Sequence, residues 1–209
     1  MDWTQLPLGP LATNCYVLSH KKECIIFDPG SEGESLTEWL NERSLKPLAV
    51  LLTHAHFDHI GAIEHIRQTF NSPVYIHKAE EQWLENPELN GSSRFGMGAI
   101  TASPADFILE KEEELIIGPF QFKLFHTPGH SPGSISYYFE EGGSLFAGDT
   151  LFMGSIGRTD LPGGNHQDLL DSIHNKLLSL PEETIVLPGH GPATSIVSEM
   201  DSNPFLNGF

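Results

Sequence analysis

Residues 48–59 read Leu-Ala-Val-Leu-Leu-Thr-His-Ala-His-Phe-Asp-His, an apolar run followed at once by clustered histidines and an aspartate. The continuous apolar stretch Leu48–Leu52 is typical of a strand buried on both faces. Four potential metal ligands then lie within six residues: His54, His56, Asp58 and His59. Such polar groups are costly to bury without a partner, which disfavours a merely His-rich loop. His54 and His56 can point the same way, whereas Asp58 and His59 begin a turn, so one segment can supply ligands to two adjacent metal ions.

Three later segments repeat this order of a strand, then Gly or Pro, then a ligand-type residue. Their ligand-type residues are His130, Asp149 and His190. If the strand ends converge on one rim, seven side chains meet there: His54, His56, Asp58, His59, His130, Asp149 and His190. Imidazoles and carboxylates without a thiolate suit Zn, Fe or Mn. Seven ligands exceed one tetrahedral site but suit two metal ions that share a bridging carboxylate.

The remaining hydrophobic pattern predicts strands in two groups, each with helices alongside. A hairpin is expected from Cys15–Leu18 and Ile25–Asp28, and helical spacing runs from Leu36 to Leu45 and from Ile60 to Phe70. Residues 86–106 read as a long loop, Thr184–Leu187 as the last strand, and 195–200 as a short helix. This organisation predicts an α/β protein, an αββα sandwich of two mixed β-sheets flanked by helices. Asp28, which precedes Pro29 and Gly30, fits either turn capping or a place near the site.

Length and charge narrow the class of protein further. A chain of 209 residues is the size of one domain, expected over 1–209. Its net charge of −17 disfavours a nucleic-acid partner. No apolar run approaches the roughly 20 residues of a membrane span, and the first residues lack the basic and apolar regions of a secretory signal. We therefore expect a cytoplasmic protein that binds neither membranes nor nucleic acid.

The sequence words THAHFDH, HTPGHSPGS, AGDTLF and PGHGP resemble, in this order, the metallo-β-lactamase superfamily. Their flanking words are closest to the glyoxalase II group (hydroxyacylglutathione hydrolases), in its short single-domain branch. The resemblance runs from about Thr13 to about Pro192. It implies two metal sites and a bridging ligand: His54, His56 and His130 for the first metal, Asp58, His59 and His190 for the second, and Asp149 for the bridge. Residues 154–164 resemble the substrate-side loop of the group, and Arg158 falls where the group carries a basic residue.

The resemblance also implies a chemistry. The expected reaction is hydrolysis of an acyl thioester, such as S-lactoyl-glutathione or another 2-hydroxyacyl thiol conjugate, by a metal-bridging hydroxide that Asp58 orients. The expected cofactors are two divalent metal ions per chain, Zn first, with Fe or Mn as alternatives. A thiolate leaving group, with a pKa near 8.5, departs without a proton donor. No residue outside the ligand set is an obvious acid, which favours a small-molecule thioester over an amide as substrate.

Other activities occur on the same fold. An iron-dependent persulfide dioxygenase needs one metal held by two His and one Asp, so Asp58, His59 and His190 argue against it. Lactonase activity stays open, and the missing export signal disfavours a β-lactamase. Longer glyoxalase II enzymes carry a C-terminal glutathione-binding helical domain after the last histidine ligand. This sequence ends soon after His190, so we expect no such domain and modest discrimination among thiol carriers.

Overall fold

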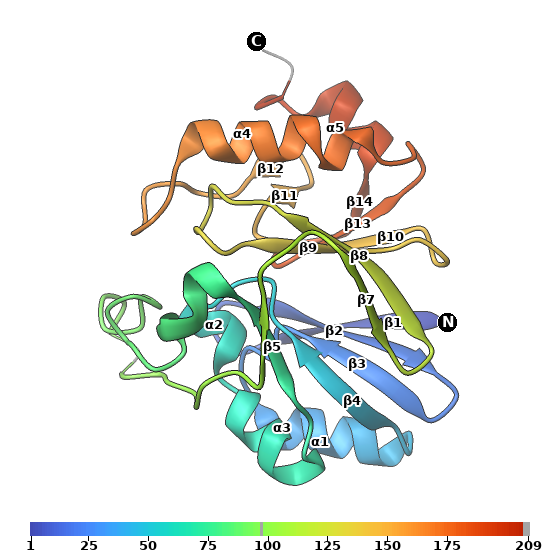
Figure 1. The fold of residues 1–209 in the computed structure, drawn as a ribbon, viewed down its shortest axis with the longest axis vertical. Coiled ribbons are helices and arrows are strands. Elements are labelled where there is room, and N and C mark those ends of the chain that lie inside the picture. The colour runs from blue at the N-terminus through green and yellow to red at the C-terminus, as the bar shows by residue number, and fades with distance from the viewer. Residues whose placement is uncertain (97, 207–209) are drawn as a thin grey trace. The chain divides into compact units, whose positions relative to one another are not determined.

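The computed structural model describes residues 1–96 and 98–206 (Figure 1). The chain divides into two compact units, the first made of Met1–Glu110 with Ile117–Phe120, and the second of Lys111–Ile116 with the described residues from Gln121 onward. Within the described residues, each unit is built on one six-stranded sheet.

The sheet of the first unit has the strand order β1-β2-β3-β4-β5-β6. Its strands are β1 (Asp2–Leu8), β2 (Thr13–His20), β3 (Glu23–Phe27), β4 (Lys46–Leu51), β5 (Val74–His77) and β6 (Phe107–Leu109). β1, β2 and β3 pair in antiparallel fashion, whereas β3, β4, β5 and β6 pair in parallel. The sheet is therefore mixed, and the carboxyl ends of its parallel strands share one edge.

Helices α1 (Gly33–Glu42) and α3 (Ile63–Phe70) pack on this sheet. Leu36 and Leu40 lie four residues apart on α1, so they share the face that joins Ile26 and Val50 in the core of the unit. α1 and α3 also contact each other and lie side by side in Figure 1. The two shorter helical segments are α2 (Phe57–Ile60) and the 3₁₀ helix η1 (Lys78–Trp83). They follow β4 and β5 at the edge of the sheet where the predicted ligands of the first unit lie.

The sheet of the second unit has the strand order β14-β13-β10-β9-β8-β7. Its strands are β7 (Glu114–Ile117), β8 (Phe120–His126), β9 (Ile135–Phe139), β10 (Ser144–Gly148), β13 (Ile185–Pro188) and β14 (Thr194–Ser195), and a small ribbon joins β11 (Leu151–Phe152) to β12 (Ser155–Ile156). β10 runs parallel to β13 and antiparallel to β9. α4 (His166–Asn175), η2 (Leu177–Ser179) and α5 (Ile196–Ser202) supply Leu169, Leu177 and Ile196 to a core shared with Val186 of the sheet.

The predicted class, two mixed sheets with flanking helices, is confirmed, and so is the long loop over the described part of 86–106. Several boundaries differ. Thr184–Leu187 is not the last strand, because β14 follows it, and β1 and β6 were not predicted at all. The apolar spacing to Leu45 overruns α1, which ends at Glu42. The apolar spacing from Ile60 to Phe70 covers parts of two helices, because α2 ends at Ile60 and α3 begins at Ile63. Among the described residues, no helix is both long and apolar enough to cross a bilayer.

The start of α4 offers a test of local stability in the second unit. The Asn165 side chain accepts hydrogen bonds from the backbone N–H groups of Gln167 and Asp168, at 3.0 and 3.3 Å. Asn165→Ala removes this cap and is expected to cost about 1 kcal/mol of stability, a fall in Tm of roughly 2–4 °C. Asn175→Ala, at the exposed last residue of the same helix, is the control in thermal unfolding. Equal Tm values for the two variants would contradict the capping role.

Candidate metal-binding site

Three imidazole rings gather where the chain leaves β4 in the first unit. His54, His56 and His59 are all buried. The ring centroids of His54 and His56 lie 4.8 Å apart, and those of His54 and His59 lie 4.1 Å apart. The sequence-predicted ligands of this segment therefore do come together. Their proximity is a local effect, because only five residues separate the end of β4 at Leu51 from the start of α2 at Phe57.

A buried carboxylate and a hydroxyl orient two of these rings. Asp28, directly after β3, accepts hydrogen bonds from the Thr53 N–H at 2.8 Å and from Thr53 Oγ1 at 2.6 Å. Its Oδ2 also accepts from His59 Nδ1 at 3.0 Å. Thr53 Oγ1 gives its proton to Asp28, so it accepts from His54 Nδ1, 3.0 Å away. Rings anchored through Nδ1 present Nε2 as the ligating atom, which is the usual arrangement of metal-binding histidines.

Asp58 is fixed in the first turn of α2. Its Oδ2 accepts a hydrogen bond from Thr13 Oγ1 at 2.8 Å and lies 3.6 Å from His59 Nε2. The backbone around it is tightly packed, since a Cβ at Gly30 would lie 2.0 Å from the Asp58 carbonyl oxygen. The Gly61 N–H donates to the Gly30 carbonyl at 3.0 Å. The loop after β3 therefore holds α2 in place by direct backbone contact.

Glu80 in η1 is a buried acidic residue that the sequence patterns did not single out. It is fully buried, and its Oε2 accepts a hydrogen bond from the Ala55 N–H at 2.6 Å. Trp83 of the same helix packs beside His56, with ring centroids 5.8 Å apart and the ring planes tilted by 41°. η1 thus fixes the segment between His54 and His56 from the side of β5.

The second unit brings His130, Asp149 and His190 together. β10 and β13 are parallel neighbours, so Asp149 and His190 follow strand ends at the same edge, where the Gly189 N–H donates to the Gly148 carbonyl at 2.8 Å. Asp149 Oδ2 lies 3.6 Å from His130 Nε2 and 3.7 Å from His190 Nε2. These separations exceed a hydrogen bond. These nitrogen–oxygen distances approach the separation of two ligand atoms that bind one ion, when each atom lies about 2.0–2.2 Å from the ion.

His130 is positioned by the loop that follows β12. Its Nδ1 donates to the Arg158 carbonyl oxygen at 2.8 Å. A Cβ at Gly157 would lie 1.9 Å from the Asp149 carbonyl oxygen and 3.1 Å from His130 Cβ. Two predicted ligands therefore depend on one loop backbone, and a glycine is required at the contact.

The Arg158 side chain, predicted to bind substrate, is exposed and paired with Asp160. Its Nε and one terminal nitrogen each donate to a separate oxygen of Asp160 at 2.7 Å. These hydrogen bonds lower the pKa of Asp160 to about 2. Part of the positive charge of Arg158 is thus already compensated within its own loop.

The end of β8, which leads to His130, is linked to Lys176, the residue that follows α4. Glu112 accepts a hydrogen bond from the His126 N–H at 2.8 Å and pairs with the Lys176 ammonium group. Lys176 Nζ also donates to the His126 carbonyl at 2.6 Å. Both contacts are made to the backbone of His126, so they fix the end of β8 whatever the His126 side chain does.

The donor chemistry of both groups fits divalent metal ions of the Zn, Fe or Mn kind, since imidazole nitrogens and carboxylate oxygens face one another. The cysteines lie elsewhere, buried in β2 and β3. Burial raises the pKa of the Cys24 thiol to about 12 and raises that of Cys15 as well. They stay protonated and are poor metal ligands. His54, His56, Asp58 and His59 could thus hold metal from the first unit, and His130, Asp149 and His190 from the second.

Comparisons with known proteins agree with this chemistry. Residues 8–190 match the profile of the metallo-beta-lactamase superfamily. A probable metallo-hydrolase of Bacillus subtilis, YqgX, is 53% identical, covering 100% of this chain and 99% of its own length. The hydroxyacylglutathione hydrolase GloC of Haemophilus influenzae is 37% identical, covering 97% and 96%.

Solved structures match over almost the whole chain. The BLEG-1 B3 metallo-beta-lactamase is 60% identical with a TM-score of 0.97, covering 99% of this chain and 100% of its own. TTHA1623, solved in a di-iron-bound form, is 40% identical with a TM-score of 0.86, covering 97% and 100%. The chain therefore belongs to the metallo-beta-lactamase superfamily, as a metallo-hydrolase with the fold of these structures.

Proposed function

We propose that this protein is a binuclear metal-dependent hydrolase of acyl thioesters, of the glyoxalase II kind. The observation that carries the proposal is the position of Asp149, whose Oδ2 lies at nearly equal distances, 3.6 and 3.7 Å, from His130 Nε2 and His190 Nε2. A carboxylate so placed between two imidazoles is suited to bridge two ions. The proposed sets are His54, His56 and His130 for one ion, and Asp58, His59 and His190 for the other.

Two divalent ions bound by these ligands would supply a nucleophilic water near neutral pH and would polarise the substrate carbonyl. Asp58 orients the attacking water, because Thr13 fixes its Oδ2 by a 2.8 Å hydrogen bond. Asp28, Thr53 and the Arg158 carbonyl hold the Nδ1 atoms of His59, His54 and His130, so these rings need no reorientation during the reaction. The thiol leaving group has a pKa near 8.5 and departs as a thiolate without a separate general acid.

The test is a panel of thioesters that carry one acyl group on glutathione, on a second cellular thiol and on a minimal thiol. Release of free thiol is followed with a chromogenic thiol reagent, and the metal content of the same sample is measured. We expect two ions per chain, with Zn as the proposed metal, and thiol release that a chelator abolishes and added metal restores. Protein that holds two ions and releases no thiol from any substrate would contradict the proposal.

The similarity to TTHA1623 in its di-iron form favours iron as the alternative metal. Metal analysis also tests a persulfide dioxygenase, which would hold one iron per chain and consume oxygen. The 60% identity to a B3 metallo-beta-lactamase favours β-lactam hydrolysis as a second candidate function. A chromogenic β-lactam assayed on the same sample tests it. We expect a slower reaction than with thioesters, because the amine leaving group has to gain a proton.

Arg158 provides a test of substrate binding. Its charge acts on an anionic substrate in both the ground state and the transition state, so Arg158→Ala is expected to raise KM with little change in kcat. The side chain is exposed, so the rise should be about two- to fivefold. The matched variant Asp160→Asn frees the guanidinium from its ion pair and should lower KM for the same anionic thioester. Steady-state kinetics that show an unchanged KM in both variants would remove Arg158 from the binding site.

A further inference from the structure

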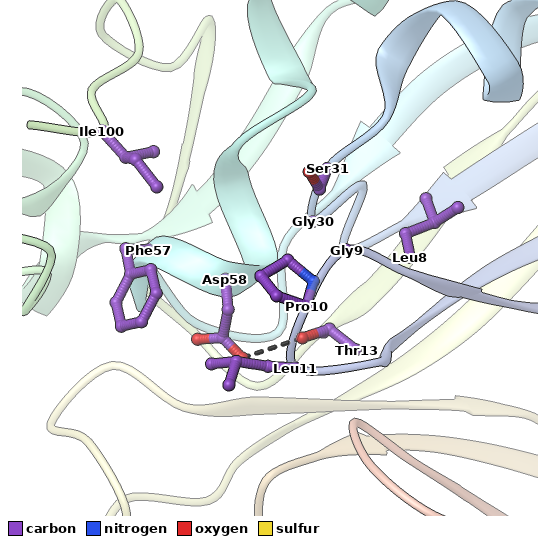
Figure 2. A pocket seen from close by; sticks show the side chains of 10 residues that line it. All are labelled: Leu8, Gly9, Pro10, Leu11, Thr13, Gly30, Ser31, Phe57, Asp58 and Ile100. Carbon is purple, nitrogen blue, oxygen red and sulfur yellow. Dashed lines mark hydrogen bonds between the residues drawn. The ribbon is translucent and has the colours of Figure 1, made fainter. Parts of the chain in front are cut away.

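A small apolar pocket in the first unit has the Asp58 side chain in its wall (Figure 2). Its volume is about 50 Å³. It is formed by the turn between β1 and β2, the segment after β3, the start of α2, and the end of the 86–106 loop. The side chains that define it are Leu8, Leu11, Thr13, Phe57, Asp58 and Ile100.

The polar side chains in the lining are those of Asp58, Thr13 and Ser31, and the rest of the wall is mainly apolar. The Thr13 hydroxyl donates to Asp58 Oδ2, as the dashed line in Figure 2 shows, so it is already used. Leu8 and Phe57 are buried and form apolar walls. Leu11 and Ile100 are partly exposed, and Leu11 keeps 49% of its surface open to solvent. An ordered water needs two to four polar partners, so the apolar part of the pocket favours an apolar guest.

The size of the pocket limits this guest. A space of roughly 10–15 Å³ holds one water molecule. A volume of about 50 Å³ therefore holds a group of about three to five heavy atoms. A propyl or isopropyl group, with three carbons, fits this volume, whereas a heptyl chain does not.

The position of Asp58 in the pocket wall indicates which part of a thioester would occupy the pocket. In the proposed function Asp58 orients the attacking water, which adds to the acyl carbon. The substituent on that carbon is one bond away from the reacting atom, whereas the thiol carrier begins beyond the sulfur. We propose that this pocket receives the alkyl side chain of a short acyl group and so selects acyl thioesters of about four to six carbons, the carbonyl carbon included. The inference rests on the proposed function and adds the acyl specificity to it.

The first test measures kcat/KM for acetyl, propionyl, butyryl, isobutyryl and octanoyl thioesters of one thiol. Each methylene that enters the pocket should raise kcat/KM about fourfold, so that butyryl exceeds acetyl by roughly fifteenfold and octanoyl falls back. Ile100→Phe fills the pocket and should cut the butyryl value at least tenfold while the acetyl value stays within about twofold. The control Ile116→Phe makes the same change on β7, at a residue that is 64% exposed, and should leave the series unchanged. A flat series, or equal effects of the two variants, would overturn the inference.

A second measurement separates this inference from the proposed function. Binding of butyrate and of acetate to the metal-loaded protein is measured by titration calorimetry, for wild type and Ile100→Phe. Tighter binding of butyrate that Ile100→Phe abolishes would support the pocket even if no thioester were hydrolysed. Hydrolysis of thioesters with equal binding of the two acids would overturn the pocket and leave the proposed function standing. Weak, equal binding together with no hydrolysis would overturn both.

Discussion

Asp149→Ala is expected to lower the metal content from two ions per chain to one or none, and to reduce thioester hydrolysis by on the order of a thousandfold or more. The physical reason is that Asp149 Oδ2 lies within 3.7 Å of both His130 Nε2 and His190 Nε2, so one truncation weakens the ligand sets of both ions. Charge stabilisation by bound metal contributes several kcal/mol to the transition state, and each 1.36 kcal/mol is a factor of ten in rate.

Metal analysis and steady-state kinetics on the same preparation check this result. Asp171→Ala is the control, because it removes an exposed carboxylate of the same unit, in the middle of α4. It should keep two ions and full activity. If Asp149→Ala also kept two ions and full activity, the binuclear assignment would be wrong.

Gly157→Ala is expected to have the second largest effect, although Gly157 is not itself a ligand. Its new Cβ would lie 1.9 Å from the Asp149 carbonyl oxygen, a backbone atom that no rotamer change can move away. Overpacking of this kind costs about 1–3 kcal/mol. The same shift would displace Asp149 and His130, and disturbed support of ligands lowers metal affinity by about 10- to 100-fold.

Gly154→Ala serves as the comparison for Gly157→Ala. Gly154 has a φ of +66° with open space around its would-be Cβ, so alanine there is strained but contacts nothing. It should lower Tm slightly and leave metal affinity unchanged, whereas Gly157→Ala lowers both. Competitive metal titration and thermal unfolding distinguish the two variants. If the metal affinity of Gly157→Ala were unchanged, the loop around residue 157 would have shifted to accommodate the new Cβ without displacing Asp149.

The part of the site that lies within one stretch of sequence could be predicted from that sequence. His54, His56, Asp58 and His59 follow one apolar strand, so local geometry alone brings them together. Asp28 was left open between turn capping and a place near the site, because its contacts with Thr53 and His59 span 25 and 31 residues. Glu80 gave no signal, since the adjacent glutamates Glu80 and Glu81 in a polar helical segment are expected to be solvated. Only the tertiary structure shows that Glu80 is buried against the Ala55 N–H.

The fold class could be predicted from the hydrophobic periodicity, but the short strands and the edge strand β1 could not. β1 contains Pro7, and its adjacent polar residues Thr4 and Gln5 break the polar–apolar alternation that would indicate a strand. It is a strand because seven of its residues pair with β2, and an edge position tolerates proline. β6 has three residues and β14 has two, too few for a periodic pattern. Their extended conformation comes from pairing with a neighbouring strand rather than from their own sequence.

The tie between Glu112, the His126 N–H and Lys176 has a consequence for proton binding. Burial raises the pKa of Glu112, but the hydrogen bonds from Lys176 and from the His126 N–H outweigh it, so the pKa of this carboxyl lies below its ordinary value. The unfolded chain then takes up more protons at Glu112 than the folded chain does. The stability it contributes is complete above the ordinary pKa of a glutamate, about 4.3, and is lost as the pH falls through the lowered folded value. Acid therefore loosens the strand end that leads to His130, and urea unfolding of wild type and Glu112→Gln should converge in stability as the buffer is acidified.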